Sequence, residues 1–298
     1  MAQAADYEVG AGSERSVDIS GRYISRLVAG ADFPQEMTIA WDPGNGAVGA
    51  VLEALTERIP GRHVLINVAV DGDFPNHHPD PTVPENLTQL RTAAEQNSAG
   101  VGFAFDGDGD RIGVIDESGR IVWGDQLLAL LARDVLANHP GATVIGDVKC
   151  SVALFDEIRR LGGEPVMWSA GHSLVKAKMA ETGALLAGEM SAHIFFADDF
   201  YGFDDGLYAA IRTLQLIRRS GKSMGELLDE LPVFVNTPEL RFECPEERKF
   251  VVATEVAQRM RKAGADVVDI DGVRVTNEDG WWLLRASNTQ AVLVARVE

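Results

Sequence analysis

The sequence predicts an α/β protein: two successive three-layer α/β domains with mostly parallel, mixed sheets, then a small α+β domain. Short apolar strand patterns alternate with helix patterns over residues 1–118 and again over 119–232, an order typical of parallel sheets. Over residues 233–298 a long helix pattern precedes several strand patterns, which indicates one helix packed on an antiparallel sheet. We therefore expect three domains, at 1–118, 119–232 and 233–298.

The first domain contains three strand patterns, each accompanied by a helix pattern. The strands are TIAWD, HVLINVAV and VGFAFD, at 38–42, 63–70 and 101–106, and a further apolar run at 112–115 is expected to be a strand as well. Helices are expected over 16–27, 47–58 and 84–96. The last of these has Pro and Glu in its first turn, where helices favour both residues. Ligands bind at the carboxyl ends of parallel strands, so the end of the third strand is a candidate site.

The second and third domains follow from the same kind of pattern. In the second, helices are expected over 125–138, 151–161, 173–181 and 205–219, and strands over 143–148, 164–169 and 184–190. In the third, strands are expected over 237–245, 266–270, 273–277, 281–287 and 291–297, and a helix over 246–263. The turn dipeptides Asp271-Gly272 and Asp279-Gly280 join successive strands, as in antiparallel hairpins.

Composition argues against several classes of function. The 298 residues carry a net charge of −18, which disfavours a nucleic-acid partner because phosphate backbones need Lys and Arg. The chain has no stretch of about 20 apolar residues, so we expect no membrane span. With two cysteines, a disulfide scaffold is not expected, and a cytoplasmic location fits. A hydrophobic content of 46% suits two or three domains, each with its own core.

The segment GFAFDGDGDRIGV places three carboxylates, Asp106, Asp108 and Asp110, at alternate positions. Alternate residues of a strand point to opposite faces, so the carboxylates converge only if Gly107 and Gly109 let the backbone turn sharply. Three carboxylates suit Mg²⁺, which would keep positions for water or a phosphate oxygen. An EF-hand-like calcium site and an ordinary solvated acidic turn are the alternatives.

Two further segments offer groups that bind sugars and phosphates. In LLAGEMSAHIFF, the side chains of Glu189, Ser191 and His193 are of the kind that bind sugar hydroxyls, although a polar strand end explains them about as well. In LLRASNTQAV, an arginine fork and a Ser-Asn-Thr turn make a phosphate cradle or an ordinary turn. The residues of this second segment are Arg285, Ser287, Asn288 and Thr289.

Three more residues are weaker candidates when each is taken alone. Arg111 follows the aspartates and either holds an anionic group or neutralises the carboxylates. Lys149 follows the VIGDV strand and either transfers a proton, binds phosphate or is a solvated surface charge. His172 begins a helix, where a histidine is more often a cap or a packed residue than a catalytic one.

Taken together, these segments resemble the α-D-phosphohexomutase family, most closely its phosphomannomutase/phosphoglucomutase group. The matching pieces occur in family order over essentially the whole chain: DPGNGAVG, FPNHHPDPTVPENL, FDGDGDR, GDVKCS, AGHS, GEMSAH and RASNTQ. The resemblance implies an enzyme that interconverts hexose 1-phosphates and hexose 6-phosphates with Mg²⁺, through a hexose 1,6-bisphosphate that turns around in the cleft.

The resemblance also implies a role for each candidate residue. Asp106, Asp108 and Asp110 would hold Mg²⁺. Arg111, Lys149 and His172 would line the cleft near the reacting groups. Substrate contacts would come from two sets, Glu189, Ser191 and His193 at the sugar, and Arg285, Ser287, Asn288 and Thr289 at the phosphate that is not transferred.

Three departures from the family pattern affect what we expect. No serine is followed by His-Asn-Pro, so the chain resembles domains two to four without the phosphoserine domain. We expect it to lack mutase turnover alone while keeping its Mg²⁺ and phosphosugar contacts. Ala192 and Ala291 replace a usual glycine and proline without removing a functional side chain. A non-catalytic phosphosugar-binding module and a calcium-binding structural protein are the alternative functions.

Overall fold

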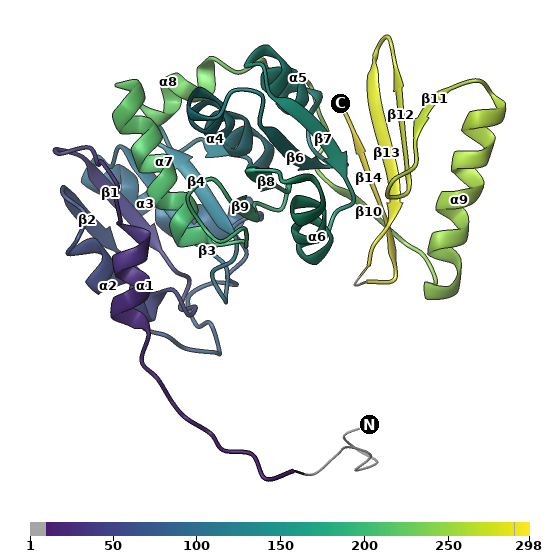
Figure 1. The fold of residues 1–298 in the computed structure, drawn as a ribbon. Helices are drawn as coiled ribbons and strands as arrows, with labels where there is room; N and C mark the ends of the chain where they lie inside the picture. The colour runs from purple at the N-terminus through teal and green to yellow at the C-terminus, as the bar shows by residue number, and fades with distance from the viewer. Residues whose placement is uncertain (1–9, 289) are drawn as a thin grey trace.

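The computed structural model describes residues 10–288 and 290–298 of the chain. The strands of this part form three sheets, and Figure 1 shows them following one another from the N-terminal to the C-terminal end. The first two sheets are mixed and have helices on both faces, whereas the third is antiparallel and carries one long helix. This architecture confirms the predicted fold class.

The first sheet has five strands, of which β3 (Val101–Phe105) and β4 (Ile112–Asp116) are buried along their whole length. Its order is β2 (Arg62–Leu65), β1 (Thr38–Asp42), β3, β4 and β5 (Ile121–Val122). Strands β1, β2 and β3 run parallel, and β4 returns antiparallel beside β3. Alternate residues face opposite layers: Ile39 and Trp41 pack toward α1 (Ser20–Leu27) and α2 (Gly49–Thr56), and Ala40 toward α3 (Thr88–Asn97).

The second sheet has the same layered design. Its order is β7 (Glu164–Trp168), β6 (Thr143–Asp147), β8 (Leu186–Gly188) and β9 (Ile194–Phe196), with only β9 antiparallel to its neighbour. Helices α4 (Gly124–Asn138) and α5 (Val152–Arg160) cover one face, and α6 (His172–Thr182) covers the other. The helices predicted here agree with the structure to within one or two residues.

One face of each of the first two sheets packs into a shared hydrophobic core, and the opposite face of each sheet has a smaller cluster of its own. Buried residues from Ile24 to Leu231 form a single cluster. Helix α7 (Gly206–Ser220) contributes to it from the junction, where it contacts β4 of the first sheet as well as α4 and β9 of the second. Helix α7 therefore links the two sheets.

The C-terminal sheet lies beside the second sheet with its helix on the outer side (Figure 1). Its order is β10 (Leu240–Glu243), β14 (Val292–Val297), β13 (Gly280–Ala286), β12 (Val273–Asn277) and β11 (Asp266–Val268). Helix α9 (Glu246–Lys262) packs on one face, with Ala257 against Val273 and Val275. On the other face Trp281 and Leu283 pack against Val148, which follows β6.

The structure differs from the predicted elements at strand ends and at short elements. The strand predicted over 63–70 stops at Leu65, because Asn67 takes a left-handed φ of 52° that a strand cannot contain. The helix predicted from residue 84 begins as a 3-10 turn, η2 (Pro84–Leu87). The patterns do not predict β5, β9 or α8 (Met224–Asp229). No helix among the described residues has the length and apolar character needed to cross a membrane.

Candidate functional site

The three aspartates converge in the loop between β3 and β4. One carboxylate oxygen from each of Asp106, Asp108 and Asp110 lies within 4.8 Å of the others. Gly109 makes the turn, with a left-handed φ of 84°, whereas Gly107 does not need this conformation. The sequence argument is therefore correct for one of the two glycines. Strands flank the loop, so its surroundings are not those of an EF-hand.

Hydrogen bonds and charge prepare this loop for a cation. The buried Asp106 carboxylate accepts hydrogen bonds from the backbone N–H groups of Gly109 (3.0 Å) and Arg111 (3.1 Å). Burial raises the pKa of Asp106 to about 6, although the hydrogen bonds from Arg111 oppose this. His193 holds the pKa of Asp110 below its usual range. Three hard oxygen donors, one of them on the exposed Asp108, fit Mg²⁺.

We expect Gly109→Ala to destabilise the protein by about 2 kcal/mol, because alanine resists a left-handed φ and must displace a neighbour. A Cβ at this position would lie 2.4 Å from the Val48 Cγ2 atom. Gly107→Ala is the matched control, since its Cβ would meet its nearest neighbour, Phe74, at 3.4 Å. Urea unfolding measures both changes. An equal decrease in the free energy of unfolding in the two variants would show that Gly109 does not shape the loop.

Arg111 is held between two carboxylates beside the aspartates. Its Nε atom donates to Asp106 at 2.8 Å, and its Nη1 atom donates to Asp80 at 3.1 Å. Asp80 comes from the proline-rich loop before η2. The guanidinium therefore has a defined orientation. Both proposed roles, charge neutralisation and anion binding, are compatible with this position, because Arg111 also lines the cleft described below.

The turn between β8 and β9 presents the candidate sugar-binding side chains. The Glu189 N–H donates to the His193 carbonyl at 3.0 Å, which closes the turn and ends the strand predicted to reach residue 190. A Glu189 oxygen lies 3.0 Å from His193 Nδ1, and Ser191 Oγ lies 3.1 Å from the same nitrogen. Burial alone would lower the pKa of His193, but Asp110 and Glu189 outweigh it and raise this pKa to about 9.

Ala192, in the same turn, has a left-handed φ of 69° and is buried. We expect Ala192→Gly to raise the free energy of unfolding by about 0.5 kcal/mol, because relief of the backbone strain exceeds the entropy gained by the unfolded chain. Ala177→Gly in the exposed face of α6 is the control and should cost about 1 kcal/mol. Thermal and urea unfolding measure whether the free energy of unfolding rises in Ala192→Gly and falls in Ala177→Gly. A similar loss in both variants would contradict the strain assigned to Ala192.

Lys149 and His172 reach the same space from the carboxyl ends of β6 and β7. Lys149 is not a solvated surface charge: its side chain is 12% exposed, and its Nζ atom lies 3.8 Å from Asp147 and 3.7 Å from Glu239. Burial lowers the pKa of Lys149, but these carboxylates raise it more, so the amine stays protonated at neutral pH. His172 is the first residue of α6, and its Nδ1 atom lies 3.0 Å from Asp204.

The candidate phosphate turn connects β13 to β14. Arg285 is buried, and its Nε atom donates to Asp271 at 2.9 Å. The Ser287 N–H donates to the Val292 carbonyl at 3.0 Å, and Ser287 Oγ accepts from the Gln290 N–H at 3.2 Å. Asn288 is exposed at the tip. Thr289, the fourth residue predicted for this site, lies outside the described residues.

A single cleft of about 760 Å³ brings these segments together from all three sheets. Nine of the predicted site residues line it: Arg111, Lys149, His172, Glu189, Ser191, His193, Arg285, Ser287 and Asn288. The three aspartates adjoin its wall through Arg111 and His193, because Asp106 contacts the first and Asp110 lies 3.4 Å from the second.

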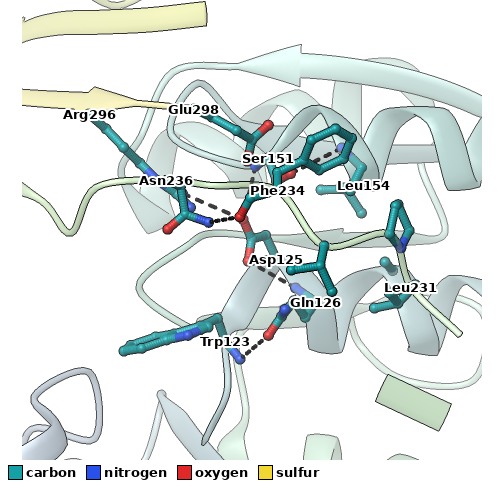
Figure 2. A pocket seen from close by; sticks show the side chains of 14 residues that line it. Trp123, Asp125, Gln126, Ser151, Leu154, Leu231, Phe234, Asn236, Arg296 and Glu298 are labelled. Carbon is teal, nitrogen blue, oxygen red and sulfur yellow. Dashed lines mark hydrogen bonds and ion pairs between the residues drawn. The ribbon is translucent and has the colours of Figure 1, made fainter. Parts of the chain in front are cut away.

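A second, much smaller cavity of about 60 Å³ lies where the last strand meets α4 and α5 (Figure 2). Figure 2 shows Arg296 and Glu298 facing Asp125 and Ser151 there. Arg296 lies 3.5 Å from Asp125, and Glu298 accepts hydrogen bonds from the Val152 N–H (3.0 Å) and the Trp281 indole (2.7 Å). This cavity is too small for a hexose, and its contacts fix the C-terminal sheet beside the cleft.

Four aspartates of the site were not among the predicted residues. Asp204 contacts His172 and also binds Lys176 at 2.8 Å. Asp271 accepts hydrogen bonds from Arg285 and from the Ala170 N–H, at 3.0 Å, and so joins the C-terminal sheet to the β7–α6 loop. The others are Asp80 and Asp147. In the sequence, Asp271 lies in a predicted turn, Asp80 in a proline-rich loop and Asp147 at a strand end. Asp204 directly precedes the helix predicted over 205–219.

Family models match the chain in three consecutive blocks. Residues 21–119 match the phosphoglucomutase/phosphomannomutase alpha/beta/alpha domain II, residues 123–234 match domain III, and residues 239–298 match the C-terminal domain. A phosphomannomutase/phosphoglucomutase of Pseudomonas putida is 43% identical over 293 residues, which are 98% of this chain and 63% of that protein. The chain thus spans about 63% of the length of this relative.

Solved structures also match the chain. A phosphoglucomutase/phosphomannomutase family protein from Burkholderia thailandensis matches with a TM-score of 0.90 at 43% identity, over 99% of this chain and 63% of that one. An N-acetylphosphoglucosamine mutase from Aspergillus fumigatus, solved in complex with GlcNAc-6P and magnesium, shares the fold with a TM-score of 0.67 at 16% identity, over 93% and 60% of the two chains. The chain belongs to the phosphoglucomutase/phosphomannomutase family and carries the regions that match its domains II, III and IV.

Proposed function

We propose that the chain binds a hexose phosphate and Mg²⁺ in the 760 Å³ cleft and serves the interconversion of hexose 1-phosphates and hexose 6-phosphates. The single observation that carries this proposal is that the cleft brings together Arg111, His193 and Arg285, one from each sheet region. A ligand with an anionic group at each end of a polar ring suits such a cleft, because carboxylate, imidazole and guanidinium groups bind hydroxyls and phosphates.

In this proposal each group of residues has one task. Asp106, Asp108 and Asp110 would hold Mg²⁺, and the cation, when bound, would stabilise negative charge on a phosphoryl group. Glu189, Ser191 and His193 bind the sugar hydroxyls. Arg285, Ser287, Asn288 and Thr289 hold the phosphate that is not transferred and so position the reacting end.

The basic residues of the cleft provide local positive charge for an anionic ligand in a protein that is acidic as a whole. A protein with a net charge of −18 repels a phosphosugar at long range. Lys149, Arg285 and Arg111 offset this repulsion locally. Because Lys149 stays protonated at neutral pH, we assign it phosphate binding or a proton donated near the reacting oxygen, and not the role of a general base.

Binding and turnover are separate expectations for this chain. The reaction proposed for the family fold starts from a phosphoserine, and the printed sequence has no serine followed by His-Asn-Pro. We therefore expect the purified chain to bind glucose 1-phosphate and glucose 1,6-bisphosphate with Mg²⁺ and to show no mutase turnover. The same cleft would then act as a phosphosugar-binding module.

Calorimetric titration with glucose 1,6-bisphosphate tests the proposal. Arg285→Met should weaken binding by about 10-fold to 100-fold, because a buried charge-assisted contact is lost. Arg259→Met, on the exposed outer face of α9, is the matched control and should leave binding unchanged. Absence of any binding, or equal affinities of wild type and Arg285→Met, would contradict the proposal.

A further inference from the structure

We propose that the cleft contains a second metal site, built from two histidines and two aspartates, that takes Zn²⁺ or a similar transition-metal ion. His172 and His193, with Asp110 and Asp204, each offer one ligand atom, and these four atoms all lie within 4.8 Å of one another. Three of the four residues come from the second sheet region, and Asp110 comes from the aspartate loop.

Three nitrogen–oxygen distances in this group are close to those around a tetrahedral ion. Zn²⁺ bound at about 2.0–2.1 Å places its ligands about 3.3 Å apart. His172 Nδ1 lies 3.0 Å from Asp204 Oδ2, and the Asp110 carboxylate lies between the two histidines, with Oδ2 at 3.9 Å from His172 Nδ1 and Oδ1 at 3.4 Å from His193 Nε2. A rotation of this carboxylate would bring one oxygen within reach of an ion held by both rings. The His172 side chain is half exposed.

Two contacts outside the four ligands orient them. The Nδ1 atom of His193 lies 3.0 Å from Glu189, which leaves Nε2 facing Asp110. A carboxylate behind a ligating imidazole is a frequent feature of zinc sites, because it fixes the ring and strengthens the ligand. Lys176 binds Asp204 Oδ1 at 2.8 Å, so the Oδ2 atom of Asp204 faces His172.

This ligand set differs in chemistry from the three aspartates. Two imidazole nitrogens and two carboxylates favour Zn²⁺ and its neighbours, whereas an all-oxygen set favours Mg²⁺. Asp110 belongs to both sets. A transition-metal ion in the histidine site therefore competes with Mg²⁺ for this carboxylate and repels it by charge. If the proposed function holds, the ion also competes with the sugar for His193.

Cobalt substitution tests the site in the whole chain without any assay of activity. Tetrahedral Co²⁺ absorbs visible light much more strongly than octahedral Co²⁺, so titration with Co²⁺ in excess Mg²⁺ reports the geometry directly. We expect wild type to give the intense tetrahedral spectrum and one equivalent of Zn²⁺ to abolish it. Asp108→Ala, which alters the aspartate set alone, should keep the spectrum.

Asp204→Asn and His172→Gln, which alter the histidine site alone, should each weaken Co²⁺ binding at least about 10-fold, because each removes one ligand. His139→Gln, at an exposed histidine after α4, is the control and should bind as wild type does. A weak octahedral spectrum in wild type, persistence of the intense spectrum in both ligand variants, or its loss in Asp108→Ala would overturn the proposal. None of these results depends on phosphosugar binding.

Discussion

Replacing Asp108 with alanine should weaken Mg²⁺ binding by about 100-fold, or about 2.7 kcal/mol, while leaving the fold intact. Asp108 is the exposed member of the three aspartates. Among the described residues its carboxylate makes no hydrogen bond or ion pair, so its removal takes away the proposed metal ligand and no contact within the protein. Removing it also relieves repulsion between like charges, so stability without metal should be equal or slightly higher.

Calorimetry measures the Mg²⁺ affinity of the variant, and urea unfolding without metal measures its stability. Asp266→Ala is the matched control, because it removes the same charge from an exposed position on β11 and should leave Mg²⁺ affinity unchanged. If Asp108→Ala binds Mg²⁺ within about 3-fold of wild type, a difference below 1 kcal/mol, the aspartate loop is not the site.

The second large effect is expected at Arg274, which joins the C-terminal sheet to the second sheet. Its Nη1 atom donates to the backbone carbonyls of Val148 (2.8 Å) and Cys150 (2.9 Å). Its guanidinium lies over the Trp281 ring, 3.6 Å from the centroid. Burial lowers the pKa of Arg274 to about 10, so the group remains charged at neutral pH.

Arg274→Met should destabilise the protein by about 3–5 kcal/mol, because two buried carbonyls lose their donor and the stacked cation is removed. Urea unfolding followed by tryptophan fluorescence is suited to this test, since Trp281 is part of the contact. Arg259→Met changes the same residue type on the exposed face of α9 and should shift stability by less than about 0.5 kcal/mol. Similar midpoints for the two variants would show that Arg274 does not join the sheets.

Local sequence patterns predicted most helices and the long strands, because amphipathic period and capping residues act within a few positions. They did not predict β9, whose three residues are a strand only because β8 lies beside them. The early end of β2 depends on one asparagine, Asn67, whose left-handed backbone is stabilised by its contact with Asp42. Such contacts between distant segments leave no periodic signal.

The residues of the candidate site also fall into two groups: those that local spacing indicates and those that only the packing of distant segments brings together. The spacing of Asp106, Asp108 and Asp110 pointed to a cation, and the structure brings their oxygens together. No spacing points to Asp204 beside His172 or to Asp271 beside Arg285, since these pairs meet only through the packing of separate elements. The burial of Lys149 is likewise a property of the assembled cleft. The roles of these residues in binding stay predictions.

The most direct test of the central claim is a crystal structure of the chain with Mn²⁺ in place of Mg²⁺ and with glucose 1,6-bisphosphate. We predict an anomalous Mn²⁺ peak at the carboxylates of Asp106, Asp108 and Asp110. In the same crystal, sugar density should extend through the cleft from His193 to Arg285. A bisphosphate bound outside this cleft, or a Mn²⁺ peak away from the three aspartates, would contradict the account.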